Sequence, residues 1–299
     1  MKKIVLIVVS DPHSVNYEII KKSLFFFKNK RKNKYIFIGC KKEFFKKIRT
    51  KNKNINFINI KKNTNTKIYL KNCFEKAFKL LQKRHANALI NMPLDKKFLP
   101  KNYVGFTEYI SDFFKKKNKT TMLLFNNSFS VCPNTTHIPL KLVSSKLSKK
   151  KIITNIKNIL VFYKQIIKIK NPKIALMGLN PHNGTDFNFS TEENKIIIPL
   201  INSKKFYPNK ILGPISPDTA FNRINKLKLN CLVGNYHDQV LPTFKYINNF
   251  NAINITLGLP FLRISPDHGV ATDIIGKNLA NPDSFLYALN FLEKYYKRI

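Results

Sequence analysis

Short apolar runs alternate with helical patterns along most of this 299-residue chain. The apolar run at residues 3–9 precedes a helical pattern at residues 17–27. The run at residues 88–91 follows a helical pattern at residues 73–82, whose apolar side chains share one face. This alternation is typical of parallel strands, because each parallel connection has to cross the sheet, usually through a helix. We therefore expect an α/β fold with mainly parallel sheets and helices on both faces.

The same patterns predict the remaining elements and the domains. Further strands are expected at residues 35–38, 55–60, 121–125, 128–132, 174–179 and 231–234, and two more apolar runs lie at residues 252–257 and 261–264. Further helices are expected at residues 43–48, 152–169 and 282–296, and in a segment that ends at residue 201 and begins with the capping-box sequence Ser-Thr-Glu-Glu. The length suggests one large or two medium domains, and a boundary near residue 128 divides the chain into two. We place the first at residues 1–128 with 265–299, and the second, which carries the candidate metal ligands, at residues 129–264.

The chain is strongly basic, with 54 Lys and Arg against 16 Asp and Glu, and a formal net charge of +38. Such a charge often marks proteins that bind nucleic acid or anionic membranes. Here the lysines are spread over the whole length among Asn and Ile, which share A/T-rich codons, so a biased genome accounts for them. No basic stretch has the aromatic pattern of an RNA-binding sheet or zinc-finger spacing. We expect no nucleic-acid partner, although the positive field would attract phosphorylated substrates.

Four well-separated cysteines indicate a reducing compartment. Cys40, Cys73, Cys132 and Cys231 form no Cys-x-x-Cys pair and are expected to be buried thiols. The apolar start of the chain stops at Ser10 without a small-residue cleavage site, so it is expected to be a strand and not a signal peptide. No segment approaches the roughly 20 apolar residues that cross a bilayer. We expect a cytoplasmic protein without a membrane partner.

Three of the six histidines lie in similar surroundings. His137 is in Thr-Thr-His-Ile-Pro-Leu, His182 is in Gly-Leu-Asn-Pro-His-Asn-Gly, and His237 is in Gly-Asn-Tyr-His-Asp-Gln-Val. Each follows an apolar run and lies near Pro or Gly, so each is expected where a strand ends and a loop begins. Ligands bind at such strand ends in layered α/β proteins. Because neutral imidazoles are good ligands for divalent metals, the three histidines predict one metal site.

Three further side chains are candidates for binding an anion. Lys245 lies eight residues after His237, and Asn254 and Arg263 flank the apolar stretch 255–262. Arg263 ends an apolar run in a chain that mostly uses Lys, and its planar guanidinium suits phosphate or carboxylate. A strand-end Arg that faces water is an equally good interpretation. Asp218 follows Gly-Pro-Ile-Ser-Pro, and from this position alone a helix N-cap is the favoured interpretation.

An ordered series of motifs runs from Thr135 almost to the C-terminus. The chain contains TTHIPL, GLNPHNG, STEEN followed by IIPLI, GPISPDTAF, YHDQVLPTFK, NITLGLPFLR and SPDHGVATDIIGK. In this order the motifs resemble those of the 4-hydroxythreonine-4-phosphate dehydrogenase family of pyridoxal phosphate biosynthesis. So many ordered motifs are far more specific than a single short pattern.

The resemblance implies a two-domain fold like that of isocitrate and isopropylmalate dehydrogenases, in a homodimer whose active site lies at the subunit interface. It also implies NAD, with NADP as the alternative, and a divalent metal: Zn, Co, Ni, Mn or Mg. The implied reaction oxidises 4-phosphooxy-L-threonine at its C3 hydroxyl and then releases CO2, which gives 3-amino-2-oxopropyl phosphate for pyridoxine 5'-phosphate biosynthesis. A metal would assist both steps as a Lewis acid, and three imidazoles lean away from Mg.

The resemblance also implies roles for individual residues. Thr107, in Gly-Phe-Thr-Glu, corresponds to the Thr of a His-Thr-Glu substrate motif, and Lys96 corresponds to the Lys of a Pro-hydrophobic-Asn-Lys segment. We take Lys96 and Asp218 as the candidates for proton transfer. The matching positions are His137, His182 and His237 for the metal, and Thr107, Lys245, Asn254 and Arg263 for the substrate.

The chain departs from the family pattern at three places. Phe106 stands where the family has a substrate-contacting His. The first turn is Ser-Asp-Pro where the family has Gly-Asp-Pro, and the loop after His182 has fewer glycines. Two alternatives therefore stay open. One is a related dehydrogenase for another four-carbon hydroxy-acid phosphate, and the other is a decayed homologue that no longer turns over.

Overall fold

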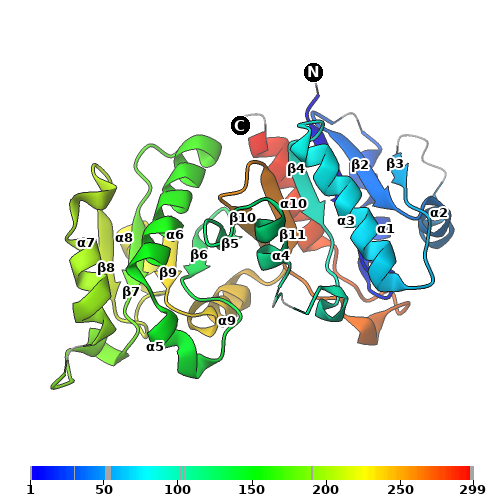
Figure 1. Ribbon diagram of the computed structural model, residues 1–299. Helices are drawn as coiled ribbons and strands as arrows, with labels where there is room; N and C mark the ends of the chain where they lie inside the picture. Colours follow the sequence, from blue (N-terminus) through cyan, green and yellow to red (C-terminus); the bar gives the residue numbers. More distant parts are fainter. Residues whose placement is uncertain are drawn as a thin grey trace. The chain divides into compact units, whose positions relative to one another are not determined.

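The computed structural model describes residues 2–29, 31–50, 55–101, 103, 105–189 and 191–296. The chain divides into two compact units. The first comprises Met1–Ile110, Phe250–Ile255 and Leu259–Ile299, and the second comprises Ser111–Asn249 and Thr256–Gly258. Figure 1 shows the strands and helices of both units.

The boundaries between the two units differ from the predicted domain boundaries at residues 128 and 264. Strand β5 (Thr121–Phe125) pairs with β6 (Ser130–Pro133), and both belong to the second unit. Strand β11 (Leu262–Pro266) pairs with β4 (Ala88–Asn91), and both belong to the first. Residues 111–128 therefore lie in the second unit, and residues 250–255 and 259–264 lie in the first.

The strands of the first unit follow the order β3-β2-β1-β4-β11-β10. Each pairing from β3 to β11 is parallel. Every residue of β4 is buried, as expected for a strand that is covered on both faces. The other strands of this unit are β1 (Ile4–Val8), β2 (Lys34–Gly39), β3 (Asn56–Asn59) and β10 (Ile253–Leu257), whose last two residues are assigned to the second unit.

Helices cover the sheet of the first unit (Figure 1). Helix α3 packs against β1 and β2, α2 packs against β3, and α10 packs against β11. Aromatic contacts reinforce this core, since the ring of Phe37 on β2 lies 5.3 Å from that of Phe27 and 5.1 Å from that of Phe44. The helices are α1 (Asn16–Lys22), α2 (Lys41–Ile48), α3 (Thr66–Gln82), α10 (Asp283–Tyr295) and α4 (Phe106–Phe113), whose residues from Ser111 on are assigned to the second unit.

The strands of the second unit follow the order β5-β6-β9-β7-β8. β5 and β6 form an antiparallel hairpin, and the pairings from β6 to β8 are parallel. Helix α6 packs against β5, and α9 packs against both β6 and β9. The elements not yet placed are β7 (Ile174–Met177), β8 (Ile211–Ile215), β9 (Cys231–Gly234), α5 (Val143–Lys146), α6 (Lys149–Val161), α7 (Ile198–Ile201), α8 (Arg223–Leu227) and α9 (His237–Asn248).

This architecture confirms the predicted α/β fold class with mainly parallel sheets. Two helices differ from their predicted ranges for local reasons. The helix expected at residues 17–27 is interrupted at Ser23, whose Oγ donates to the carbonyl of Ile19 at 2.9 Å. Helix α3 begins at Thr66, because the Asn65 side chain accepts hydrogen bonds from the backbone N–H groups of Lys67 and Ile68. Within the described residues, no helix is both long enough and apolar enough to span a bilayer.

Candidate functional site

Two of the three predicted metal histidines follow neighbouring parallel strands. His137 lies after β6 and His237 begins α9 directly after β9, and the register pairs Pro133 with Gly234. Backbone hydrogen bonds continue past the strand ends, from Asn134 N to the Gly234 carbonyl at 2.8 Å and from Thr135 N to the carbonyl of the next residue at 3.0 Å. These bonds hold the two loops together, and the imidazole centroids of His137 and His237 lie 5.7 Å apart.

The third histidine follows the next strand of the same sheet. His182 lies in the turn after β7, which pairs with β9, and Gln239 Nε2 ties this turn to α9 by donating to the Gly178 carbonyl at 2.9 Å. The His182 side chain is exposed, and its Nδ1 hydrogen-bonds to the Asp186 carboxylate. This bond and the charge of Asp186 raise the pKa of His182. The Asp186 carboxylate thus orients the His182 ring through Nδ1, and Nε2 lies on the opposite side of the ring.

A buried carboxylate that the sequence reading missed supports this turn. Glu193 is 0% exposed. Its Oε1 accepts from the backbone N–H groups of Leu179 at 2.6 Å and Asn180 at 2.8 Å, and its Oε2 accepts from Asn180 Nδ2 at 2.9 Å. Burial by itself raises the pKa of Glu193, but these hydrogen bonds outweigh it and lower the pKa below its ordinary value. The predicted capping box includes Ser190, which lies outside the described residues.

Left-handed backbone shapes the loop that carries His182. His182 and Asn183 have φ values of 48° and 59°, and Gly184 has a φ of 73°. Asn tolerates this region better than most side chains. A Cβ on Gly184 would lie 2.5 Å from Thr191 Oγ1 and 2.9 Å from Glu193 Oε2, so only glycine fits there. The loop has therefore kept a glycine at its tightest point.

The donor chemistry fits a divalent metal in part. His137 and His237 offer two imidazoles at neighbouring strand ends, and imidazole is a common ligand of Zn and other first-row divalent metals. Across the described ranges, however, no three His, Cys, Asp or Glu side chains are gathered closely enough to hold one ion. The structure therefore brings two predicted ligands together and places His182 on the adjoining strand end without joining it to them.

The other two predicted site residues of the second unit are exposed. Asp218 lies in the turn after β8, several residues before α8 begins, so it is not that helix's N-cap. The neighbouring Ser216 hydroxyl lowers the pKa of Asp218, and the positive charge of His182 adds to this effect. Lys245 lies on α9, two turns after His237. On a helix this separation corresponds to about 12 Å along the axis.

Arg263 is the most strongly constrained of the predicted residues. It is 3% exposed on β11, in the first unit. Its Nε donates to Asn91 Oδ1 at 2.6 Å and its Nη1 donates to Thr107 Oγ1 at 3.4 Å. The ring of Phe106 lies 5.2 Å from the guanidinium carbon. Burial lowers the pKa of Arg263 to about 9, while the charge of Glu108 opposes this shift. The structure thus brings Arg263 and Thr107 together.

Asn254 and Lys96 lie at other positions in the first unit. Asn254 is on β10, which follows β11 in the strand order. Its Oδ1 is buried and accepts no hydrogen bond from the residues that the structure describes. Such an atom usually has a partner in a ligand or an ordered water. Lys96 is exposed and begins a short 3-10 helix, Lys96–Phe98, after β4.

The turn that precedes Lys96 is anchored by residues that the sequence reading did not select. Asp11 is 1% exposed, and its carboxylate accepts from His13 N at 2.8 Å and from Asp95 N at 3.2 Å. Ser10, which replaces the family's glycine, keeps a φ of 63° in the left-handed region. A buried Asp directly after the first strand is a signal that could have drawn attention to this anchor.

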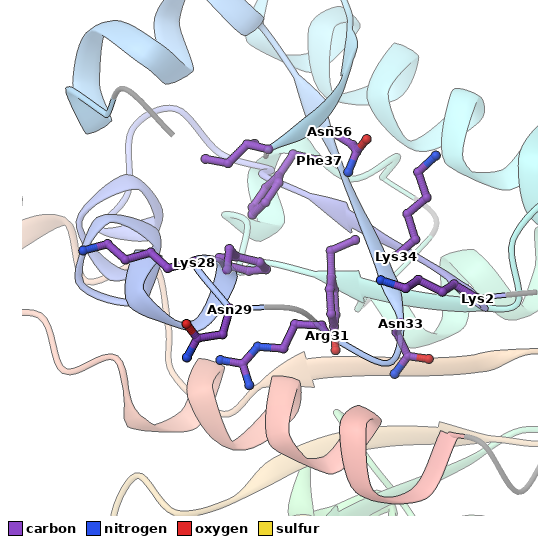
Figure 2. A pocket seen from close by; sticks show the side chains of 11 residues that line it. Lys2, Lys28, Asn29, Arg31, Asn33, Lys34, Phe37 and Asn56 are labelled. Atoms are coloured by element: carbon purple, nitrogen blue, oxygen red, sulfur yellow. The ribbon is translucent and has the colours of Figure 1, made fainter. Parts of the chain in front are cut away.

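The first unit has a pocket of about 460 Å³ beside the beginning of β2 (Figure 2). None of the nine predicted site residues is among the described residues that line it. Its cationic side chains do not converge on one point. Figure 2 shows Lys28 and Lys34 extending away from each other. Arg31 donates to the Phe26 carbonyl at 2.5 Å and lies 3.9 Å from the centre of that ring. The pocket thus lacks the convergent polar groups that orient a ligand.

A second pocket of about 420 Å³ borders the turn after β1. Ser14 and Glu18 line it from this turn and α1, Lys47 lines it from α2, and Gly276 and Asn278 line it from the loop before α10. Its volume is within the range of about 300–1,000 Å³ that small-molecule sites have.

Comparison with known proteins gives consistent results at the levels of family and fold. A family model described as pyridoxal phosphate biosynthetic protein PdxA matches residues 5–292. A 4-hydroxythreonine-4-phosphate dehydrogenase from Sulfurihydrogenibium sp. is 36% identical over 313 residues, with 95% of each chain covered.

Solved structures extend the comparison to the fold. A structure described as a 4-hydroxythreonine-4-phosphate dehydrogenase from Salmonella typhimurium matches with a TM-score of 0.82 and 27% identity, and the match covers 98% of this chain and 99% of that one. An isocitrate dehydrogenase from Methylococcus capsulatus matches with a TM-score of 0.53 over 97% of this chain and 85% of that one. At 11% identity, this second match concerns the fold alone.

Proposed function

Since the chain belongs to the pyridoxal phosphate biosynthetic protein PdxA family, we propose that it oxidises 4-phosphooxy-L-threonine and decarboxylates the product. A hydride leaves C3 for NAD, and the C3 hydroxyl loses its proton. The resulting β-keto acid releases its carboxylate as CO2, and 3-amino-2-oxopropyl phosphate remains. This compound is an intermediate for pyridoxine 5'-phosphate, so the reaction serves pyridoxal phosphate biosynthesis.

The observation that carries this proposal is the approach of His137 and His237 at the ends of neighbouring parallel strands, with rings 5.7 Å apart. Together with His182 they would hold a divalent metal, for which Zn, Co, Ni and Mn suit imidazole better than Mg does. A metal bound there would supply Lewis-acid polarisation of substrate oxygens in both steps. Asp186 orients the His182 ring through Nδ1, as carboxylates do for metal-binding histidines.

The substrate's anionic and polar groups are assigned to four side chains. Arg263 and Lys245 supply positive charge for phosphate or carboxylate, and the strong burial of Arg263 reduces the solvent screening of its charge. Thr107 lies within hydrogen-bonding distance of Arg263, so one group can contact both. The buried Oδ1 of Asn254 can accept a hydrogen bond from the substrate's hydroxyl or amino group.

Two side chains are assigned to proton transfer. Asp218 accepts the proton of the C3 hydroxyl, for which a carboxylate with a lowered pKa is in the required ionised form. After CO2 has left, Lys96 delivers a proton to the carbon that carried the carboxylate. Asp11 holds the turn before Lys96 and so limits the positions that this side chain can reach.

NAD and the assembly complete the proposal. The pocket beside the turn after β1 suits part of a dinucleotide by its volume, and Lys47 places positive charge at its edge for a phosphate. NADP is the alternative cofactor. By family resemblance we also propose a homodimer whose active site is completed at the subunit interface, located in the cytoplasm, with no nucleic-acid or membrane partner.

A panel of substrates tests the proposed reaction. The purified, metal-loaded protein should reduce NAD to NADH when 4-phosphooxy-L-threonine is the substrate. For the same compound without its phosphate, kcat/KM should fall at least about a hundredfold, since two cations lose their anion. Phe106 favours one rival, a dehydrogenase for another four-carbon hydroxy-acid phosphate. A higher kcat/KM with such an acid would select the rival. A failure to bind NAD or any of these acids would identify a decayed homologue.

A further inference from the structure

Two side-chain amides extend the pairing of β7 with β9 beyond its last backbone pair. The register of these strands ends one residue before Met177. Past this point, Asn235 Nδ2 donates to the Met177 carbonyl at 3.0 Å, and Gln239 Nε2 donates to the Gly178 carbonyl at 2.9 Å. The two amides thus take the place of sheet hydrogen bonds at the start of the turn that carries His182.

Each of these amides is fixed by a second hydrogen bond. Gln239 Oε1 accepts from Asn235 N at 2.7 Å, so the Gln239 side chain bridges the end of β9 and the turn after β7. Asn235 Oδ1 accepts from Asn134 Nδ2 at 3.3 Å, and Asn134 directly follows β6. Because each amide uses its oxygen as an acceptor and its nitrogen as a donor, neither can turn over and keep its partners. Asn235 is 0% exposed and therefore joins the ends of three strands inside the protein.

The Gln239 side chain lies against a glycine that leaves room for it. A Cβ on Gly234, the last residue of β9, would lie 3.0 Å from Gln239 Oε1 and 2.5 Å from Val240 Cγ1. Gln239 also lies in the first turn of α9, which begins at His237. One helix end therefore carries one of the assigned metal ligands and the side chain that ties down the turn of another.

From these bonds we propose that Asn235 and Gln239 are positioning residues of the metal site: they hold the turn that carries His182 in register with the strand ends that carry His137 and His237, and so set the affinity for a divalent cation. This inference rests on the proposed function, which assigns the three histidines as ligands. It adds two residues that act through the backbone of the strand ends.

The three histidines depend on the two amides to different extents. Backbone hydrogen bonds hold the end of β6 to that of β9, so His137 and His237 should keep their separation when the Gln239 amide is lost. The turn of His182 loses a direct tie to α9. Loss of the Gln239 amide should therefore weaken metal binding through His182, and it should have little further effect in a protein that already lacks His182.

The test is a double-mutant cycle that measures the Kd for Co²⁺, a metal that suits imidazole ligands. Gln239→Met keeps nearly the length of the side chain and removes both hydrogen bonds. Gln239→Met and His182→Ala should each raise the Kd at least about tenfold. The double variant should bind Co²⁺ as weakly as His182→Ala alone, within about twofold. Competition with a chromophoric chelator measures each Kd.

Asn235→Ala is the second variant. It should also raise the Kd for Co²⁺ at least about tenfold. In addition, it should lower the thermal midpoint of the metal-free protein, because its removal leaves the Asn134 amide without an acceptor inside the protein. Gln239 is only partly buried, so Gln239→Met should lower this midpoint less and keep the test usable if Asn235→Ala does not fold.

Asn230→Ala is the matched control. Asn230 directly precedes β9, and its Oδ1 accepts at 2.8 Å from the backbone N–H of Lys173, which directly precedes β7. This bond ties the same two strands at their opposite ends, where none of the assigned ligands lies. The control should keep the Kd for Co²⁺ within about twofold of the wild-type value.

The outcomes separate this inference from the proposed function. A wild-type Kd in Gln239→Met overturns the inference, and so does a double variant whose loss is the full product of the two single losses. An equal loss of affinity in Asn230→Ala also overturns it, because the amides would then act only through general stability. If the wild-type protein binds Co²⁺ but produces no NADH, the proposed reaction has failed, and the Kd values still decide the inference.

Discussion

A protein with both His137 and His237 changed to alanine should no longer bind stoichiometric divalent metal. The two rings lie 5.7 Å apart at neighbouring strand ends, so the double change removes two of the three assigned ligands at once. Dehydrogenase activity should fall at least about a thousandfold, which corresponds to roughly 4 kcal/mol of lost transition-state stabilisation. Metal content per chain after exhaustive dialysis and kcat/KM with saturating NAD are the measurements.

The matched control for this change is His85→Ala. His85 is exposed after α3 and belongs to none of the assigned sets, so metal content and activity should both be retained. The single variant His182→Ala tests whether the third histidine is a ligand. If it is, the variant should bind the metal more weakly than the wild type, and if it is not, metal affinity should be unchanged. One metal ion per chain in the His137/His237 double variant, with an intact fold, would refute the ligand assignment.

Changing Glu193 to alanine should destabilise the second unit by about 3 kcal/mol at pH 7. The buried carboxylate accepts hydrogen bonds from Leu179 N, Asn180 N and Asn180 Nδ2, and its removal leaves these donors without an acceptor. Glu193→Gln should cost less, about 1–2 kcal/mol, because one oxygen remains to accept. Urea unfolding at pH 7 measures both changes. Metal affinity should fall as well, because the turn that carries His182 loosens.

The pH dependence of this loss has a definite sign. The folded-state pKa of Glu193 lies below its ordinary value, so its contribution is fully present above an unfolded-state pKa of about 4.3 and is lost as the pH falls through the folded-state value. Glu193→Gln lacks this dependence. The difference in unfolding free energy between the wild type and Glu193→Gln should therefore be largest at neutral pH and shrink below about pH 4. A difference that stays constant with pH would contradict this account.

Glu192 provides the matched comparison for Glu193. It is the preceding residue, it is only partly buried, and its Oε2 also accepts from Asn180 Nδ2 at 2.9 Å. Because water can replace lost hydrogen bonds at an accessible position, Glu192→Gln should cost less than Glu193→Gln. Equal losses would mean that burial of the carboxylate is not the cause.

Local patterns were sufficient for most strands and for the placement of the histidines. Continuous apolar runs located β1, β4, β7 and β9, and the Pro and Gly residues after them indicated that His137, His182 and His237 would follow strand ends. The sequence did not predict α9, because Pro242 lies inside it and usually ends a helix. It did not predict β8 either, where Gly213 and Pro214 interrupt the apolar pattern of an edge strand.

The supporting residues depend on contacts that no local pattern contains. Arg263 and its partner Asn91 are 172 residues apart, and only the pairing of β4 with β11 brings them together. Glu193 was interpreted as part of a helix start, yet its carboxylate binds the turn after β7. The strands and turns were predictable because their signals lie in neighbouring residues. The partners of Arg263 and of the turn that carries His182 were not, because they depend on tertiary packing.

We propose that this chain oxidises and decarboxylates 4-phosphooxy-L-threonine with NAD. The most direct test is a simultaneous measurement of NADH and CO2 from the purified, metal-loaded protein with this substrate. Both products should form in equal amounts, and complete metal removal should abolish both. NADH without CO2, products that persist after complete metal removal, or no NADH at all from a folded, metal-loaded protein would contradict it.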